Sequence, residues 1–250
     1  MAIITGGVSG IGEGAVHLFW ENGAKVIIAD IQGHLGQAIA DNLGKNGTYI
    51  HCNVTEEDEV IKLIDSSHST VSMYGKPDIM YNNAGIIRYQ HGRHLKRPKV
   101  WFRTGDWGES GWGFLGAKHA ARVMVPRGPG CKLFTASACT SIAGMSTHSY
   151  ASSKHAVVGL AKNLAAELGQ HNIRVLRLAL CSEHQYWTRT GWLHSQSRGH
   201  FEWSREFERD SPQASDEATY VSGLNLGVDG RYSVVNPSIV VAVRSSLLHA

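Results

Sequence analysis

The sequence lacks long apolar runs and has little cysteine. No stretch of about 18 or more apolar residues occurs among its 250 residues, so it predicts no membrane span. Residues 1–7 contain no basic cluster or cleavage motif, and we expect no secretory signal. The four cysteines form no Cys-x-x-Cys pair, which favours reduced, mostly buried thiols in a cytoplasmic protein. Neither the cysteines nor the 14 histidines show a metal-ligand spacing.

An excess of one charge sign is also missing. The formal net charge is +3, and six basic residues lie between Ile86 and Gly105 without any acid. The rest of the chain is slightly acidic, so the basic character is local. That basic stretch matches no nucleic-acid-binding module, and we expect neither a nucleic-acid nor a membrane partner.

Apolar residues make up 42% of the chain, enough for a buried core. Short apolar runs alternate with helical patterns, which is typical of βαβ units. We predict a doubly wound parallel sheet, a Rossmann-like α/β fold, in a single domain over residues 1–250. The expected strands are 2–5, 25–30, 48–52, 78–81, 131–136, 174–179 and 223–228, and the expected helices are 10–22, 34–43, 56–73, 114–125 and 149–168.

A glycine-rich segment, Thr5-Gly-Gly-Val-Ser-Gly-Ile-Gly12, joins the first strand to the first helix. The first of its spaced glycines allows a tight turn, the second a close approach to a diphosphate, and the third close helix–strand packing. The helix N-terminus then offers N–H groups to phosphate. The alternative is a plain glycine-rich turn, but the flanking strand and helix favour nucleotide binding. The expected cofactor contacts here are Gly6, Ser9, Gly10, Ile11 and Gly12.

Asp30 ends the second expected strand. A carboxylate there can accept hydrogen bonds from an adenosine ribose, and it repels a 2′-phosphate. No Lys or Arg stands at Ile31, at Gln32 or within the glycine loop, which favours NAD over NADP. A surface aspartate that opens a loop is the alternative interpretation.

Tyr150-Ala-Ser-Ser-Lys154 places a phenol and an ammonium one turn apart on one helix face. A nearby cation favours the phenolate, so we expect Lys154 to lower the pKa of Tyr150. Tyr150 is then suited to move a proton at a carbonyl or carbinol oxygen during hydride transfer, and Ser137 to hydrogen-bond that oxygen. A Tyr-x-x-x-Lys pair alone is most often a solvent-exposed pair on a helix surface with no catalytic role.

In combination, Thr5–Gly12, Asn82-Asn-Ala-Gly85, Ser137 and Tyr150-x-x-x-Lys154 resemble the classical short-chain dehydrogenase/reductase family. Residues 150–160 and 220–237 further resemble its plant branch of secoisolariciresinol- and xanthoxin-dehydrogenase-like enzymes. The resemblance implies that Ser137, Tyr150 and Lys154 are catalytic and that Lys154 also holds the nicotinamide ribose. It implies cofactor contacts from Asp30, Ile31, Asn53, Val54, Asn83, Ala84, Gly85, Tyr150 and Lys154. Asn53 stands where the family usually has Asp.

The resemblance also implies a reaction and an assembly. We expect NAD-dependent interconversion of a secondary alcohol and a ketone on a small, mainly apolar terpenoid or phenolic substrate of plant secondary metabolism. The helix of residues 149–168 is apolar on more than one face, and in the family it forms a subunit interface. We therefore expect a homodimer or homotetramer. An NADP-linked ketone reductase is disfavoured by Asp30.

Two atypical segments, residues 89–113 and 181–211, lack periodicity and hold six of the seven tryptophans. They also hold departures from the family pattern: its Asn-x-x-Gly-x-Phe motif has Glu109 for Asn and Trp112 for Gly. Leu176 and Leu180 replace a later Asn and a Pro, and no comparable nicotinamide-clamping Thr follows. The alternative function is therefore a catalytically impaired, nucleotide-binding pseudoenzyme or a damaged gene product.

We hypothesise that both atypical segments are out-of-frame or misspliced translations inside an otherwise intact gene; a remodelled pocket is the alternative. The hypothesis predicts that another reading frame across residues 89–113 encodes Asn-x-x-Gly-x-Phe. Sequencing the transcript and translating its other two frames checks this. Absence of the motif from both frames would contradict the hypothesis.

Overall fold

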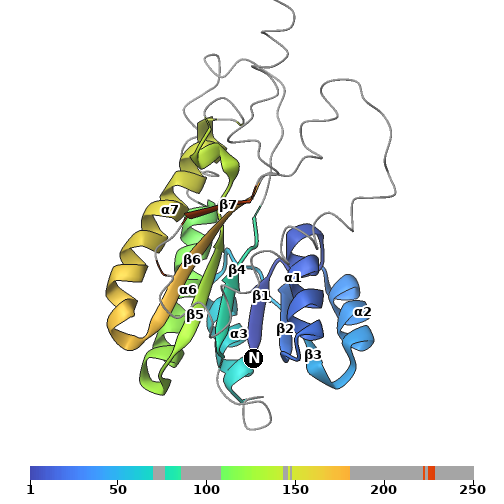
Figure 1. Ribbon diagram of the computed structural model, residues 1–250. Helices are drawn as coiled ribbons and strands as arrows, with labels where there is room; N and C mark the ends of the chain where they lie inside the picture. Colours follow the sequence, from blue (N-terminus) through green and yellow to red (C-terminus); the bar gives the residue numbers. More distant parts are fainter. Residues whose placement is uncertain are drawn as a thin grey trace, which may run out of the picture.

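A computed structural model describes residues 1–69, 77–85, 108–142, 146, 148–180, 222 and 225–228. Within them, a seven-stranded parallel sheet has the order β3-β2-β1-β4-β5-β6-β7, which confirms the predicted Rossmann-like fold (Figure 1). The strands are β1 (Ala2–Thr5), β2 (Val26–Asp30), β3 (Gly47–His51), β4 (Ile79–Asn82), β5 (Gly130–Thr135), β6 (Ile173–Leu180) and β7 (Asn225–Val228). The α-helices are α1 (Gly10–Glu21), α2 (Gly33–Leu43), α3 (Glu57–Ser69), α6 (Gly108–Met124) and α7 (His148–Leu168). Short 3-10 turns are η1 (Gly44–Asn46), η3 (Val125–Arg127), η4 (Ala138–Thr140) and η5 (Gly169–His171).

The strand order reverses between β1 and β4. The chain runs outward from β1 through β2 to β3 and then returns to β4 on the other side of β1. Both neighbours pair with β1 in parallel, with Ala2 opposite Val26 on one side and Ile79 on the other. Such a reversal opens a crevice at the carboxyl ends of the strands, where open α/β sheets bind their ligands.

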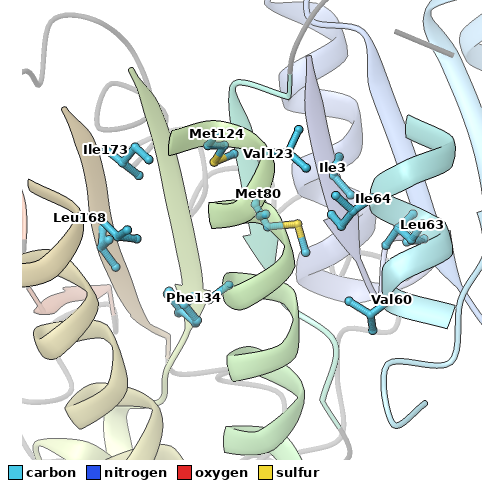
Figure 2. Close-up of a cluster of buried hydrophobic side chains, with 14 of the residues drawn as sticks. Ile3, Val60, Leu63, Ile64, Met80, Val123, Met124, Phe134, Leu168 and Ile173 are labelled. Atoms are coloured by element: carbon cyan, nitrogen blue, oxygen red, sulfur yellow. The ribbon is translucent and has the colours of Figure 1, made fainter. Parts of the chain in front are cut away.

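Helices cover the two faces of the sheet separately. Apolar side chains of α1 and α2 pack with one face, and those of α3, α6 and α7 pack with the other. Figure 2 shows the second cluster, where Leu63 and Ile64 of α3 lie close to Ile3 and Met80 of the sheet. Every residue of β1 and β2 is buried, as the continuous apolar runs of a sheet covered on both faces require.

Helix α6 begins six residues earlier than the sequence indicated. We expected its start at residue 114, but it begins at Gly108, inside the atypical segment 89–113. Gly108, Gly111 and Gly113 weaken intrinsic helix propensity and hide the pattern. Within this earlier part, the helix packs on the sheet at Gly113, where an added Cβ would lie 3.4 Å from the Phe134 side chain of β5. The remaining parts of both atypical segments lie outside the described residues.

The described cysteines, Cys52, Cys131 and Cys139, are buried free thiols, and Cys181 lies outside the described residues. Burial raises the pKa of Cys52 and of Cys131 to about 12, so both remain protonated at neutral pH. Across the ranges that the structure describes, no helix has the length and hydropathy of a membrane span.

Two basic side chains are buried on the face of the sheet that α6 and α7 cover. Lys132 of β5 has no solvent exposure, and its Nζ donates to the carbonyl of Ala117 in α6 at 2.7 Å. Arg177 of β6 is 1% exposed and donates to the carbonyl of Val158 in α7 at 2.7 Å. Desolvation lowers the pKa of both groups, that of Lys132 to about 7, although Glu167 partly opposes the effect on Lys132.

The lowered pKa of Lys132 predicts that the free energy of unfolding depends on pH. Its pKa lies below the ~10.4 of an exposed lysine, so unfolded chains bind more protons than folded ones between about pH 7 and pH 10. The free energy of unfolding therefore rises with pH across that window. Lys132→Met should remove this rise and add about 1–3 kcal/mol of stability near neutral pH, because no amine is then buried. Urea unfolding across the pH window measures both effects, with exposed Lys162→Met as control. Equal pH slopes in wild type and Lys132→Met would contradict the prediction.

Candidate active site

The glycine loop between β1 and α1 is held tightly against its own helix. Gly6 has φ +66° and Gly10 has φ +55°, both in the left-handed region that favours glycine. A Cβ on Gly12 would lie 1.9 Å from the carbonyl oxygen of Gly6, whereas one on Gly10 would meet nothing within 4 Å. Gly12 thus packs the helix against the loop rather than against the strand. Gly10 leaves open space in front of the helix.

The N-terminus of α1 is available to an anion. Ser9 caps the helix with extended backbone, and its side chain makes no capping hydrogen bond. Ser9 and Gly10 are exposed, and Ile11 is half-buried. The first N–H groups of an α-helix have no intrahelical acceptor and stand at the positive end of its dipole. Open space, free donors and a positive dipole end fit the diphosphate of a dinucleotide.

Asn83 joins the ends of three strands. Its Nδ2 donates to the carbonyls of Thr5 at 3.1 Å and Gly6 at 3.2 Å. Its Oδ1 accepts from the Thr135 hydroxyl at 2.8 Å, and Thr135 Oγ1 also shares a 2.9 Å hydrogen bond with the Tyr81 hydroxyl. The Thr5 hydroxyl accepts from the backbone N–H groups of Asn83 and of Ala84. This group of side chains fixes the glycine loop relative to β4 and β5.

Asp30 lies at the carboxyl end of β2 and is 7% exposed. Its Oδ1 accepts from the Gln32 backbone N–H at 3.0 Å. Oδ2 has no hydrogen-bond partner in the part of the chain that the structure describes, and it can accept from a ribose hydroxyl. The next residue, Ile31, is 61% exposed and apolar. The carboxylate therefore fits the adenosine ribose of a dinucleotide.

Lys154 and Tyr150 lie on α7 beside the carboxyl end of β5. Lys154 is 5% exposed, its Nζ donates to the carbonyl of Thr135 at 2.9 Å, and it lies 5.6 Å from the centroid of the Tyr150 ring. Ser137 follows β5 by two residues and precedes η4, which packs against α7. Its Oγ accepts from the Cys139 backbone N–H at 3.3 Å, so the hydroxyl proton remains available to an acceptor.

A cavity lies at the strand-order reversal, between the sheet end and helices α6 and α7. The proposed cofactor residues Val54, Ala84 and Lys154 contribute to its wall. Trp112 lines it too, although the family resemblance expects glycine there. The complete lining is Thr5, Val54, Asn82, Ala84, Trp112, Gly113, Phe134, Thr135, Lys154 and Val157.

The structure thus brings most of the expected site residues to one edge of the sheet. Gly6, Asn83 and Ala84 are in direct contact, Val54 and Lys154 share the cavity, and Asp30 ends the neighbouring strand. Gly85 is exposed at the end of the described segment, and Asn53 lies in the loop after β3. Thr5, Tyr81 and Thr135 were not expected as site residues. Their position at strand ends was the available signal, but it does not show which side chains meet.

Comparison with known proteins agrees with this geometry. The family model for short chain dehydrogenases matches residues 1–182. The (+)-borneol dehydrogenase 1 of Salvia officinalis is 45% identical and aligns with 95% of each chain. The secoisolariciresinol dehydrogenase of Forsythia intermedia is 42% identical, over 96% of this chain and 91% of that protein.

A solved structure supports the same assignment. The crystal structure of a short-chain type dehydrogenase/reductase from Mycobacterium marinum superposes with a TM-score of 0.79 at 30% identity, covering 94% of this chain and 95% of the other. Sequence matches over nearly the whole chain and the shared sheet topology point to one family. The chain belongs to the short-chain dehydrogenase/reductase family of oxidoreductases, which use nicotinamide cofactors, and its relatives include plant enzymes.

Proposed function

We propose that this protein is an NAD-dependent oxidoreductase that interconverts a secondary alcohol and a ketone. The observation that carries the proposal is the position of Lys154. Its buried ammonium lines the cavity at the strand-order reversal between β1 and β4, which we call the switch-point cavity. The ammonium donates to the Thr135 carbonyl and lies 5.6 Å from the Tyr150 ring centroid. A phenol and an ammonium are thereby held next to the place where the fold binds dinucleotides.

Tyr150 moves the proton in the proposed mechanism. Its hydroxyl donates to a carbonyl oxygen during reduction and removes the proton from a carbinol oxygen during oxidation. The Lys154 ammonium stabilises the phenolate between these events, and Ser137 holds the same substrate oxygen through its hydroxyl. A bound nicotinamide dinucleotide supplies or accepts the hydride. The helix α1 N-terminus holds the diphosphate, and Asp30 holds the adenosine ribose.

The preference for NAD over NADP follows from charge. Asp30 places a carboxylate where a 2′-phosphate would stand, and the repulsion disfavours NADP. The glycine loop and residues 31–33 contain no Lys or Arg that could pair with this phosphate. The site therefore selects the dinucleotide without a 2′-phosphate.

A small, mainly apolar terpenoid or phenolic alcohol is the proposed substrate. Val54, Trp112, Phe134 and Val157 contribute apolar side chains to the cavity wall, beside the polar Thr5, Asn82, Thr135 and Lys154. The printed names of two relatives, a borneol dehydrogenase and a secoisolariciresinol dehydrogenase, support substrates of these two classes. Assembly as a homodimer or homotetramer and a location in the cytoplasm also belong to this proposal, and the assembly is supported by the resemblance to a family in which the counterpart of α7 forms a subunit interface.

Helix α6 favours a second candidate, a nucleotide-binding protein with impaired turnover. Trp112 brings an indole into the cavity beside Lys154, where the family pattern has glycine. Glu109, one turn earlier, replaces the asparagine of that pattern. A protein of this kind would bind a dinucleotide at the same carboxyl ends of the strands but would not oxidise an alcohol.

Tyr150→Phe separates the two candidates. We expect the wild type to oxidise members of a panel of cyclic terpenoid and phenolic alcohols, and the variant to lose about 10²–10⁴ of that rate. NADH binding, measured by tryptophan-to-nicotinamide energy transfer, should be retained in the variant, because only the Tyr150 hydroxyl is lost and Asp30, the α1 N-terminus and Lys154 remain. It should be stronger than NADPH binding in both proteins. His155→Ala, an exposed neighbour on the same helix, is the control. NADH binding without wild-type turnover would favour the impaired protein, and tighter binding of NADPH would overturn the role of Asp30.

Alanine substitutions at three glycines test the proposed diphosphate site. Gly10 and Gly23 both have positive φ and open space, so alanine should cost each about 1–2 kcal/mol of stability. Only Gly10→Ala should weaken NADH binding, because its methyl group stands in front of the helix N-terminus. Gly12→Ala should destabilise more than either, because its Cβ meets the Gly6 backbone. Urea unfolding and NADH titration measure these effects. Equal loss of NADH affinity in Gly10→Ala and Gly23→Ala would speak against the site.

A further inference from the structure

The carbonyl that holds Lys154 lies just beyond the backbone ladder between β4 and β5. This ladder ends at Phe134, one residue before Thr135. On the other side of β5, the Ala136 N–H donates to the Leu178 carbonyl of β6 at 2.8 Å. The C=O and N–H of one trans peptide unit point in opposite directions, so the Thr135 carbonyl is turned away from β6 and toward the side of β4. There, past the end of the ladder, it accepts from Lys154 Nζ at 2.9 Å.

The hydroxyl of Thr135 links this residue to β4 and to the turn that follows it. Asn83 Nδ2 donates to the carbonyls of Thr5 and Gly6, which can only accept, so the Asn83 Oδ1 faces Thr135. A hydroxyl has one proton, and that of Thr135 is therefore donated to Asn83 Oδ1 at 2.8 Å. The 2.9 Å bond between Thr135 and Tyr81 can form beside it only if the Tyr81 phenol is the donor.

The Tyr81 phenol is a buried donor on a rigid support. Tyr81 has no solvent exposure, and it pairs with Ile4 of β1 and with Leu133 of β5 in the two backbone ladders of β4. Its carbonyl also accepts from the Thr5 hydroxyl at 3.3 Å. The position of the phenol oxygen is thus set by the centre of the sheet, and Thr135 is oriented from it.

Thr135 is held in three directions by three different groups. Its peptide unit is fixed to β6 by the backbone, its hydroxyl is fixed to β4 and the following turn, and its carbonyl holds the ammonium of α7. The hydroxyl contacts lie on the side toward which the carbonyl is turned. That ammonium lies 5.6 Å from the centroid of the Tyr150 ring, and its stabilisation of a phenolate depends on this separation.

Resting on the proposed function, we propose that Thr135, oriented by the buried Tyr81 phenol, is a positioning residue for proton transfer. Its hydroxyl fixes the carbonyl that holds Lys154 beside Tyr150. Neither residue exchanges a proton with the substrate in this scheme, because both act through the place of the Lys154 ammonium. Removal of the Thr135 hydroxyl should therefore change the acidity of Tyr150 and not only the stability of the fold.

Titration of the Tyr150 phenol tests the proposal without requiring turnover. The ultraviolet absorbance of its phenolate is the difference between each protein and the same protein carrying Tyr150→Phe. We expect Thr135→Val to raise the measured pKa of Tyr150 by about one unit, because valine keeps the shape of threonine but leaves Lys154 less firmly held. Thr135→Ser, which keeps a hydroxyl, should restore the wild-type value. Thr48→Val, which removes a hydroxyl from the half-buried strand β3, should leave the value unchanged.

A second variant covers the case in which Thr135→Val folds poorly. Tyr81→Phe keeps the buried ring and loses only the oxygen, and it should raise the pKa of Tyr150 by a smaller amount. An unchanged pKa in either folded variant, with or without a loss of stability, overturns the proposal.

Lys154→Met separates this inference from the proposed function. It should raise the pKa of Tyr150 more than Thr135→Val does, because the cation itself is lost. An unchanged pKa in Lys154→Met contradicts the proposed pairing of Tyr150 with Lys154, and this inference with it. A raised pKa in Lys154→Met but not in Thr135→Val leaves that pairing intact and contradicts the role of Thr135 alone.

Discussion

The Asn83 side chain holds together the sheet end on which the site is built. A primary amide suits this place because it donates and accepts at once: Nδ2 bonds the carbonyls of β1 and the glycine loop, and Oδ1 bonds Thr135 of β5. Backbone ladders pair β1 with β4 and β4 with β5, and the Asn83 side chain adds a direct link from the glycine loop to Thr135 of β5. One side chain thus links the proposed phosphate-binding loop to the strand that leads to the proposed catalytic residues.

Thr135 extends this bridge to helix α7, which carries the proposed catalytic residues Tyr150 and Lys154. Its hydroxyl bonds Asn83, and its carbonyl accepts from Lys154 Nζ at 2.9 Å. The ammonium is thereby aimed at the cavity by the same strand that precedes Ser137. Buried hydrogen bonds are worth more in a low-dielectric interior, and they are costly to leave incomplete. The proposed cofactor-binding and proton-transfer residues therefore share one continuous set of contacts.

The sequence predicted the repetitive features of the fold well. Strands such as 25–30 were visible because a sheet covered on both faces needs uninterrupted apolar runs, and Val26–Asp30 is buried throughout. The motifs at Gly6–Gly12 and Tyr150–Lys154 were visible because their spacing is local. Strand and helix bounds then differ from expectation by only a few residues, apart from the glycine-rich start of α6 at Gly108.

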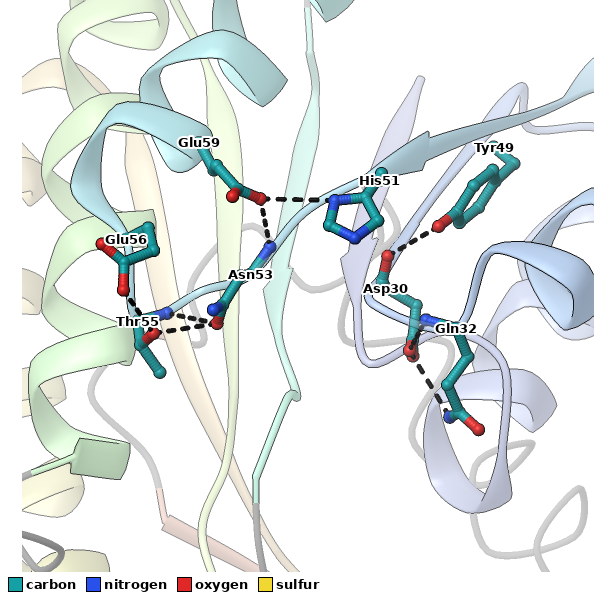
Figure 3. Close-up of polar contacts among 8 residues, drawn as sticks. All are labelled: Asp30, Gln32, Tyr49, His51, Asn53, Thr55, Glu56 and Glu59. Carbon is teal, nitrogen blue, oxygen red and sulfur yellow. Dashed lines mark hydrogen bonds and ion pairs between the residues drawn. The ribbon is translucent and has the colours of Figure 1, made fainter.

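Long-range side-chain contacts could not be predicted. The bond from Thr135 to Asn83 joins residues 52 positions apart, and no local pattern marks the pair. Lys132 and Arg177 sit within strand patterns, yet each is buried because a helix carbonyl lies in reach of its long side chain. The orientation of the Asn53 amide likewise depends on a turn, in which its Oδ1 accepts from the Thr55 backbone N–H at 3.1 Å (Figure 3). These features follow from packing of distant elements, which local spacing does not encode.

A crystal structure of the complex with NADH measures most directly whether one sheet end holds both functions. We expect the diphosphate against the backbone of Gly10–Gly12, the adenosine ribose on Asp30, and the nicotinamide ring beside Tyr150 and Lys154, with the bonds of Asn83 preserved. A dinucleotide bound away from the β1–β4 reversal, or a nicotinamide ring out of reach of Tyr150, would contradict this arrangement.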